Sequence, residues 1–250
     1  ERIGGAGNVA LNIQALGASV SIISVVGKDT EAELLNGLLN NNNINTDHLI
    51  RSTERITTNK IRIIGRNQQM MRLDAEITKP LSSADEQALL SAFENYAERE
   101  RPSIVILEDY NKGVLTETVI EKIISICRAK NIFTAVDPKR KNFFAYRYVD
   151  IFKPNLHEAK EGLNIISDEV SDQSLKNIHA ALHEKLNHNI SLITLSEKGV
   201  FYQTNEDHLI IPTHIRSIAD VSGAGDTVIA VASIVYAATR NVRLMAEMAN

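Results

Sequence analysis

SIVILEDYNKGVLTETVIEKIISICRAKNIFTAV, residues 103–136, contains two short β-branched runs separated by a longer helical pattern. The runs are SIVIL at 103–107 and IFTAV at 132–136, and the helical pattern follows Thr116. A strand, a helix and a second strand in this order predict a crossover unit, because parallel strands need a long connection that returns over the sheet. This stretch therefore predicts an α/β fold.

The same alternation of short apolar runs and helical patterns extends through most of the sequence. It predicts further strands at 20–26, 150–154 and 191–195, and further helices after Gly7, Asp29, Asn155, Ser171 and Gly223. Another helix is predicted to begin at Ser83, where Glu86 three residues later completes a capping box. Segments 56–74 and 199–212 are typical of β-hairpins, and NNNINTD at 41–47 is typical of a loop.

These elements predict a three-layer α/β/α sandwich with a mostly parallel central sheet, from which the hairpin at 56–74 projects as a small β lid. Neither an internal repeat nor a linker rich in Pro, Gly or Ser is found, so residues 1–250 are predicted to form a single domain. In the hairpin, Ile61, Ile63 and Ile64 leave apolar side chains on both faces. We therefore expect a two-fold homodimer in which equivalent hairpins pack together.

Composition limits the classes of partner. The 250 residues are 44% hydrophobic and carry a net charge of −4. Basic runs interleaved with aromatic residues are absent, so a small-molecule partner is expected and no nucleic acid. No apolar run approaches the roughly 18 residues of a membrane span and no signal segment opens the chain, which predicts a cytoplasmic protein without membrane contact. The single cysteine, Cys127, lies in the apolar stretch VIEKIISIC and is predicted to be a buried thiol in a reducing compartment.

The strongest chemical signal is DVSGAGDT at 220–227, which precedes the apolar helical run VIAVASIVYAA. Gly223 and Gly225 allow a tight turn, and the N-terminus of the following helix is electropositive, so the turn predicts an anion-binding site. Asp226 falls in the first helical turn, where its carboxylate could accept the proton of a hydroxyl group that attacks a bound phosphate. The alternative is a glycine turn whose aspartate only stabilises the helix dipole.

A second glycine cluster, GGAGNVALNIQALG at 4–17, also leads into a helix. Gly5, Gly7 and Ala10 match the fingerprint of dinucleotide-binding proteins, and Asp29 follows at about the spacing of the ribose-binding acid, roughly 20 residues later. A Rossmann-type NAD-dependent dehydrogenase is therefore the main alternative function.

Two observations favour a sugar kinase over a dehydrogenase. Asn8 and Asn12 place amide side chains on one helical face, which suits sugar hydroxyls better than a pyrophosphate. A dehydrogenase would also leave the motif at 220–227 without a role. A Walker A kinase is excluded, because the pattern GxxxxGK[ST] does not occur in the chain.

Taken together, the two clusters resemble the ribokinase-like (PfkB) sugar kinase family, whose signatures are GG-x-x-N near the start and D-x-x-GAGD near the end. The resemblance extends over essentially the whole chain and implies a ribokinase-like fold and a carbohydrate kinase that uses ATP and Mg²⁺. It also implies site residues: Gly4, Gly5 and Asn8 for the sugar, Gly223, Ala224 and Gly225 for the anion hole, and Asp226 as the catalytic base.

The resemblance implies a nucleotide side as well. Asn155 and Glu158 match an N-x-x-E element near the phosphates, and Glu158 would reach Mg²⁺ indirectly through them. The same two residues also fit a helix N-terminal cap, and both interpretations can hold together. Thr194, Ser196 and Gly199 in TLSEKG match the loop that holds the nucleotide in this family.

Within the family, three segments are similar to the kinases that phosphorylate D-glycero-D-manno-heptose 7-phosphate at its anomeric hydroxyl for ADP-heptose and lipopolysaccharide-core biosynthesis. They are RNQQMMRLD at 66–74, LEDYNKGVL at 107–115 and VDPKRKNFFAYR at 136–147. A phosphorylated sugar needs cationic partners, and the candidates in these segments are Arg66, Arg72, Lys112 and Lys139. Taken singly, each is also compatible with a solvated surface charge.

The ends of the chain, a non-catalytic alternative and a histidine pair give three further expectations. Family members have an earlier strand and a later adenine-side segment, so the chain is expected to be truncated at both ends. A non-catalytic relative that binds sugar without transferring phosphate stays open as an alternative. His179 and His183 have the i, i+4 spacing of a metal pair, but without a HExxH pattern a solvated helix face is expected.

Overall fold

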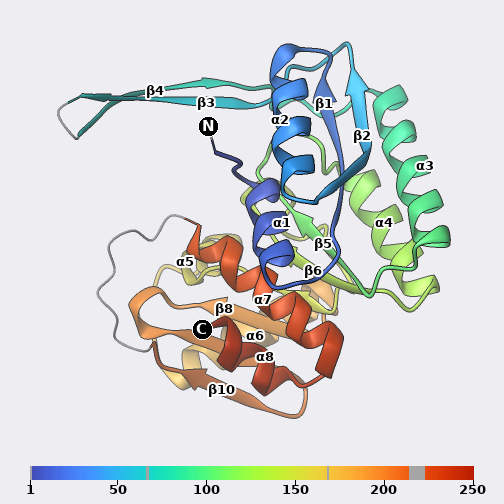
Figure 1. The fold of residues 1–250 in the computed structure, drawn as a ribbon. Coiled ribbons are helices and arrows are strands. Elements are labelled where there is room, and N and C mark those ends of the chain that lie inside the picture. Colours follow the sequence, from blue (N-terminus) through green and yellow to red (C-terminus); the bar gives the residue numbers. More distant parts are fainter. Residues whose placement is uncertain (1, 66–67, 168, 214–222) are drawn as a thin grey trace.

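A six-stranded sheet forms the centre of the computed structural model, which describes residues 2–65, 68–167, 169–213 and 223–250 (Figure 1). Its strand order is β10-β9-β8-β7-β6-β5. Strands β5 to β8 run parallel, and β9 and β10 continue the sheet antiparallel. The strands are β5 (Ile104–Glu108), β6 (Phe133–Asp137), β7 (Ile151–Phe152), β8 (Ile190–Thr194), β9 (Val200–Gln203) and β10 (His208–Ile211).

Helices cover both faces of this sheet, because successive strand residues point to opposite sides. Val136 and Phe152 belong to one apolar cluster with residues of α3 (Ser83–Arg99), α4 (Glu117–Ala129) and α6 (Asp172–Leu186). Ala135 and Ile151 belong to a second cluster with α1 (Ala6–Ala15), α7 (Ala224–Thr239) and α8 (Val242–Ala249). The predicted three-layer α/β/α arrangement is therefore confirmed.

A smaller parallel pair, β1 (Ser21–Gly27) and β2 (Asn45–Ser52), is connected by α2 (Thr30–Asn41). The predicted loop at 41–47 is wrong in its second half, because β2 begins at Asn45. Asn45 and Asp47 are exposed while Thr46 between them is buried, so the strand has a polar outer face that resembles a loop in sequence.

The predicted hairpin projects from the body of the molecule as β3 (Asn59–Gly65) and β4 (Gln68–Ala75) (Figure 1). Ile61 pairs with Leu73, and Ile63 pairs with Met71. Because directly paired residues share a face, these four exposed apolar side chains lie on one side of the ribbon. The predicted mixture of apolar residues on both faces thus applies only near the tip, after the irregularity between Ile63 and Ile64.

Helix starts follow the predicted capping residues closely. The side chains of Asp29, Thr116, Asn155 and Ser171 accept the expected backbone hydrogen bonds. For α3 the cap is Ser82 and not Ser83, because the Ser82 hydroxyl accepts from the amide of Asp85. Glu86 does not close a capping box, since its carboxylate accepts a hydrogen bond from the Thr116 hydroxyl at the start of α4.

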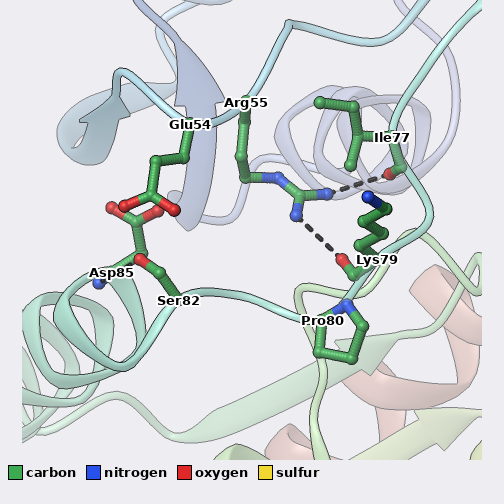
Figure 2. Close-up of a pocket in the computed structure, with 7 residues that line it drawn as sticks. All are labelled: Glu54, Arg55, Ile77, Lys79, Pro80, Ser82 and Asp85. Carbon is green, nitrogen blue, oxygen red and sulfur yellow. Dashed lines mark hydrogen bonds between the residues drawn. The ribbon is translucent and has the colours of Figure 1, made fainter.

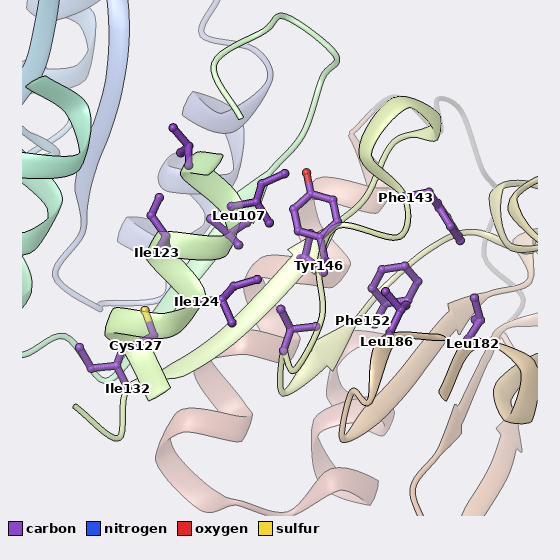
Figure 3. Packing of buried hydrophobic residues seen from close by; sticks show 14 of the residues in the cluster. Leu107, Ile123, Ile124, Cys127, Ile132, Phe143, Tyr146, Phe152, Leu182 and Leu186 are labelled. Atoms are coloured by element: carbon purple, nitrogen blue, oxygen red, sulfur yellow. The ribbon is translucent and has the colours of Figure 1, made fainter. Parts of the chain in front are cut away.

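The larger apolar cluster fills the space between α4, α6 and the sheet (Figure 3). Cys127 is fully buried in it beside Ile123 and Ile132, as predicted for a core thiol. Burial raises the pKa of the Cys127 thiol to about 12, so the side chain is an unreactive apolar group at neutral pH.

The expectation of a solvated histidine face on α6 is wrong. His179 is buried, and its Nδ1 lies 2.9 Å from the hydroxyl oxygen of Ser191 on β8. The fully buried His188 places Nε2 2.6 Å from the same oxygen. His183 contributes a third ring, stacked on that of His179. Within the described residues, no group of three His, Cys, Asp or Glu side chains is arranged to hold a metal ion.

We expect this histidine cluster to make the protein sensitive to acid. Burial lowers the pKa of His179 to about 4 and that of His188 to about 3. The unfolded chain takes up these protons near pH 6.5, so between about pH 6.5 and 4 it binds more protons than the folded protein. The free energy of unfolding should therefore fall as the pH is lowered through this range, in urea titrations followed by circular dichroism.

A matched pair of variants tests this origin. His188→Gln should make the pH dependence of the unfolding free energy shallower between pH 6.5 and 4, whereas His157→Gln, at an exposed position on α5 (Leu156–Gly162), should not. Identical pH profiles for the two variants would assign the acid sensitivity to other groups.

Candidate active site

Polar side chains collect where the four parallel strands end. Because β5, β6, β7 and β8 run in the same direction, their carboxyl ends meet at one edge of the sheet, which is where ligands bind in such folds. The residues that end or follow these strands are Glu108 and Tyr110, Asp137 and Lys139, Lys153 and Asn155, and Thr194 and Ser196.

Helix α7 brings the glycine turn to this edge. Gly223 precedes the helix with φ of 83°, a conformation that favours glycine. A Cβ on Gly225 would lie 3.7 Å from Lys153 Nζ and 4.0 Å from Asp137 Oδ2. The turn therefore faces the ends of β6 and β7, and residues 220–222 of the motif lie outside the described residues.

Asp226, in the first turn of α7, is held by two donors. Asn8 Nδ2 donates to Oδ2 at 2.7 Å, and the Tyr110 hydroxyl donates to Oδ1 at 2.9 Å. Residues from the two glycine clusters are thus in direct contact, and the loop after β5 reaches the same carboxylate. Tyr110 is not among the sequence-predicted site residues, although its place after a predicted strand end is a signal that could identify it.

A series of ion pairs between charged side chains lies next to the glycine turn. Lys153 is only 2% exposed and its ammonium nitrogen lies 2.9 Å from Asp137 Oδ2. Lys139 contacts the other oxygen of Asp137 at 3.0 Å and Glu158 Oε1 at 2.6 Å. Burial opposes the charge of Lys139, but these two carboxylates outweigh it and raise the Lys139 pKa. Lys153 and Asp137 are further site candidates, and no sequence motif identifies them.

Glu108, a half-buried residue at the end of β5, adds a carboxyl group whose two oxygens are buried. It pairs in register with Asp137, and neither of its carboxyl oxygens has a hydrogen-bond partner within the described residues. Burial and the neighbouring Asp137 carboxylate raise the pKa of Glu108 well above its ordinary value. The site therefore contains a carboxyl group that is protonated more readily than an ordinary glutamate.

On the predicted nucleotide side, the helix cap is present. The Asn155 side chain accepts from the Glu158 amide at 2.8 Å, and the Glu158 carboxylate accepts from the Asn155 amide at 2.9 Å. Thr194 forms a β-bridge with Asn155, which brings TLSEKG beside the cap. Within that loop Ser196 starts the short 3₁₀ turn η2 (Ser196–Lys198), and Gly199 follows it with φ of 97°.

The predicted phosphate-binding cations do not converge on one point. Lys139 lies with Glu158, as described above, and Arg66 lies outside the described residues. Arg72 and Lys112 lie at the hairpin, where Arg72 pairs with Asp74 at 2.8 Å and Lys112 with Glu76 at 2.6 Å. Lys60 links the two pairs, at 3.3 Å from Asp74 and 3.4 Å from Glu76. Three cations thus share two carboxylates at the base of the hairpin.

Asp29, the acid of the dinucleotide fingerprint, and Asn12 of the first glycine cluster both have partners within the protein. Both carboxylate oxygens of Asp29 accept hydrogen bonds from Thr57, and one also caps α2. The side chain of Asn12 donates to the backbone of Asn8 and accepts weakly, at 3.4 Å, from the Thr227 hydroxyl. Asp29 is therefore engaged within the protein and not free to bind a ribose, which argues against a dehydrogenase.

A separate cavity of about 320 Å³ lies at the base of the hairpin (Figure 2). It is lined by Glu54, Arg55, Ile77, Lys79, Pro80, Ser82 and Asp85. None of the predicted site residues lines it, so the chemistry is assigned to the carboxyl edge of the sheet.

A mostly parallel α/β/α sandwich, with a glycine turn and a carboxylate at the carboxyl edge of its strands, defines a ribokinase-like kinase fold. The chain belongs to the pfkB family of carbohydrate kinases, whose profile matches residues 1–250. Both the predicted fold and the predicted family are confirmed, and the dehydrogenase alternative is excluded.

Comparison with individual proteins supports the same family. The bifunctional protein HldE of Desulfatibacillum aliphaticivorans is 37% identical over 252 residues, which cover 99% of this chain and 50% of that protein. The chain spans about half the length of the curated relatives it matches.

Solved structures share the fold at low sequence identity. The tetrameric inhibited form of phosphofructokinase-2 from Escherichia coli has a TM-score of 0.82 at 18% identity, covering 100% of this chain and 80% of that one. Arabidopsis thaliana ribokinase, complexed with ribose and ATP, has a TM-score of 0.76 at 14% identity, covering 99% and 78%. No helix in the described part of the chain is long and apolar enough to cross a membrane.

Proposed function

We propose that the protein transfers the γ-phosphoryl group of ATP to the anomeric hydroxyl of D-glycero-D-manno-heptose 7-phosphate. The product, heptose 1,7-bisphosphate, would serve ADP-heptose and lipopolysaccharide-core biosynthesis. The observation that carries the kinase chemistry is the position of Asp226, which lies in the glycine turn and contacts Asn8 of the first cluster. The three heptose-kinase-like segments and the match to bifunctional HldE proteins support the substrate.

In the proposed reaction, the Asp226 carboxylate accepts the proton of the anomeric hydroxyl as its oxygen attacks the γ-phosphorus and the bond to ADP breaks. Backbone amides of residues 223–225 would hold the charge that develops on the transferred group. The proximity of Lys153 to Gly225 supports a further role in neutralising that charge.

The carboxylate of Glu158, on the proposed nucleotide side, fits a magnesium ion that is bound indirectly through water. Mg²⁺ usually keeps several waters and binds one or two carboxylates together with substrate phosphates. Both Glu158 oxygens already accept hydrogen bonds, from Lys139 and from the backbone of Asn155, so Glu158 would hold the ion through water. When bound, Mg²⁺ would neutralise phosphate charge.

The hairpin base fits the phosphate that the substrate already carries. Lys60, Arg72 and Lys112 outnumber the two carboxylates they share, which leaves an excess positive charge on the polar side of the hairpin. The phosphate of a bound sugar could replace the two carboxylates as the partner of these cations, through charge-assisted hydrogen bonds. We therefore assign the 7-phosphate end of the sugar to the hairpin and the anomeric end to Asp226.

This assignment predicts the substrate preference. The full-length protein should phosphorylate heptose 7-phosphate with a kcat/KM at least about 100-fold above that for ribose, fructose or adenosine, because two or more charge-assisted hydrogen bonds contribute about 1.5–3 kcal/mol each. A coupled assay of ADP release with this panel measures the ratio. Equal activity on an unphosphorylated sugar would contradict the heptose assignment and leave the kinase assignment standing.

We also propose that the hairpin closes over the sugar and forms a homodimer. The apolar side of the ribbon carries Ile61, Ile63, Met71 and Leu73, all at least two-fifths exposed. A partner hairpin would cover these side chains while the charged side faces the substrate.

The full-length protein is accordingly expected to be a dimer in light scattering at micromolar concentration. Ile63→Glu should yield monomers, because it places a charge at the centre of the apolar side. Ile166→Glu is the matched control, since Ile166 is 97% exposed in a loop outside the hairpin. A monomeric wild-type protein, or equal effects of the two variants, would contradict the proposed interface.

A further inference from the structure

The contact between Tyr110 and Asp226 has the same chemistry as the contact that an acceptor sugar needs. The Tyr110 hydroxyl donates to Asp226 Oδ1, and the other oxygen, Oδ2, is taken by Asn8. An acceptor hydroxyl must also donate to this carboxylate before its proton is transferred. Tyr110 is 36% exposed, so its hydroxyl can be displaced by a ligand that arrives from solvent.

The tyrosine ring rests on the first glycine cluster. Gly5 has φ of 59°, and a Cβ placed there would lie 3.6 Å from the ring of Tyr110. Tyr110 therefore stands between the glycine cluster and Asp226, in the space that the proposed function assigns to the sugar. Burial, and then the Asp226 charge, raise the pKa of Tyr110, which keeps its hydroxyl a donor at neutral pH.

The backbone on either side of Tyr110 is anchored. Before it, the buried Asp109 carboxylate accepts hydrogen bonds from the Tyr146 hydroxyl at 2.7 Å and from the Asn142 side chain at 3.1 Å. Its other oxygen accepts from the amide of Asn111 at 2.7 Å. The orientation of Tyr110 is thus set by a network in the core.

After Tyr110, the loop is tied to the base of the hairpin. The Arg55 guanidinium donates to the carbonyls of Ile77 and Lys79, at 2.9 and 3.0 Å, on the strand-to-helix connection (Figure 2). It also donates to the carbonyl of Lys112, two residues after Tyr110. One side chain therefore joins both ends of the hairpin base to the loop that carries the tyrosine.

We propose that Tyr110 is a positioning residue that occupies the acceptor side of Asp226 when sugar is absent, and that Arg55 holds it there through the 110–113 loop. This inference rests on the proposed kinase function. With Tyr110 in place, water is kept from the carboxylate. Without it, a water oxygen could attack the γ-phosphorus while the bond to ADP breaks and Asp226 takes the proton, giving ADP and inorganic phosphate.

Tyr110→Phe in the full-length protein tests this role. ADP release in the presence of ATP and the absence of sugar should rise about tenfold or more, because one hydrogen bond to a charged group no longer competes with water. The KM for heptose 7-phosphate should fall, since the sugar no longer displaces the phenol. Tyr148→Phe, at an exposed tyrosine outside the site, should change neither quantity.

Arg55→Lys provides an independent second variant. Lysine keeps the positive charge but cannot reach three carbonyls in a planar fork, so sugar-independent ADP release should rise by a smaller factor. Combined with Tyr110→Phe it should add nothing, because Arg55 acts through the tyrosine. Arg243→Lys, in an exposed pair with Glu247, is the control for this exchange.

Two results would overturn the inference, and they are distinguishable. Wild-type protein that turns over heptose 7-phosphate, with sugar-independent ADP release and sugar KM unchanged in both Tyr110→Phe and Arg55→Lys, contradicts the positioning role alone. Wild-type protein with no sugar-dependent turnover overturns the proposed function and this inference together. In the first case, reduced thermal stability of Tyr110→Phe would identify Tyr110 as a purely structural residue.

Discussion

Replacing Asp226 by asparagine is expected to lower kcat by about 10²–10⁴ and to preserve ATP binding, because an amide cannot accept the proton of the attacking hydroxyl. Asparagine keeps the shape of the side chain, and the Tyr110 hydroxyl can donate to its amide oxygen as it does to Asp226 Oδ1. The proposed anion hole consists of backbone groups of residues 223–225, which the substitution does not change. Single-turnover kinetics and calorimetric titration with ATP on the full-length protein measure the two effects separately.

A helix-dipole role for Asp226 predicts a different result, namely a loss of less than about 1 kcal/mol of stability and a kcat near that of the wild type. Asp172→Asn is the matched control, because Asp172 also lies in the first turn of a long helix, α6, at an exposed position. It should show only this small loss. Retained turnover in the Asp226 variant would remove the residue from the catalytic role, and the proton of the attacking hydroxyl would then need another acceptor.

The contact between Asn8 and Asp226 shows how far sequence patterns reach. Each residue is identified by its own glycine motif, and each motif predicts its helix correctly. Their contact across 218 positions depends on the packing of α1 against α7, which no local periodicity encodes. The sequence therefore predicts the two halves of the site, and tertiary packing determines which side chains meet.

Lys153 and Asp137 illustrate which site residues the sequence patterns do not identify. In sequence each is a single charged residue at the end of an apolar run, and charged residues are usually exposed. They become site candidates only once β6 and β7 are known to be neighbours that end at the same edge. The topology of the sheet, and not the motif, brings their side chains to the glycine turn.

The prediction of a solvated histidine face on α6 is wrong for a related reason. The spacing of His179 and His183 gives the face of the helix they share, but it does not say what covers that face. Ser191 and His188, which follow the helix in the chain, cover it. A polar cluster that satisfies itself in the core cannot be told from a solvated face by spacing alone.

Replacing Gly199 by alanine is expected to lower the free energy of unfolding by about 3 kcal/mol or more, the sum of backbone strain and overpacking. Gly199 has φ of 97° and ψ of −138°, a conformation that is essentially restricted to glycine. A Cβ there would overlap the carbonyl oxygen of Ile211 and lie 2.8 Å from the amide nitrogen of Thr213. Because both neighbours are backbone atoms, the chain itself must shift, and urea denaturation of the full-length variant measures the cost.

Gly17→Ala separates the two contributions. Gly17 also has a positive φ, 84°, after the end of α1, but a Cβ there would have no heavy atom within 4 Å. Alanine at this position should therefore cost only the conformational strain, about 1–2 kcal/mol. The Gly199 variant should also bind ATP more weakly. The displaced backbone is hydrogen-bonded to Leu195, which lies between Thr194 and Ser196 in the proposed nucleotide loop. Equal losses of stability in the two variants would show that the strand β10 yields to the added methyl group. In that case, Gly199 would be required for its backbone conformation alone.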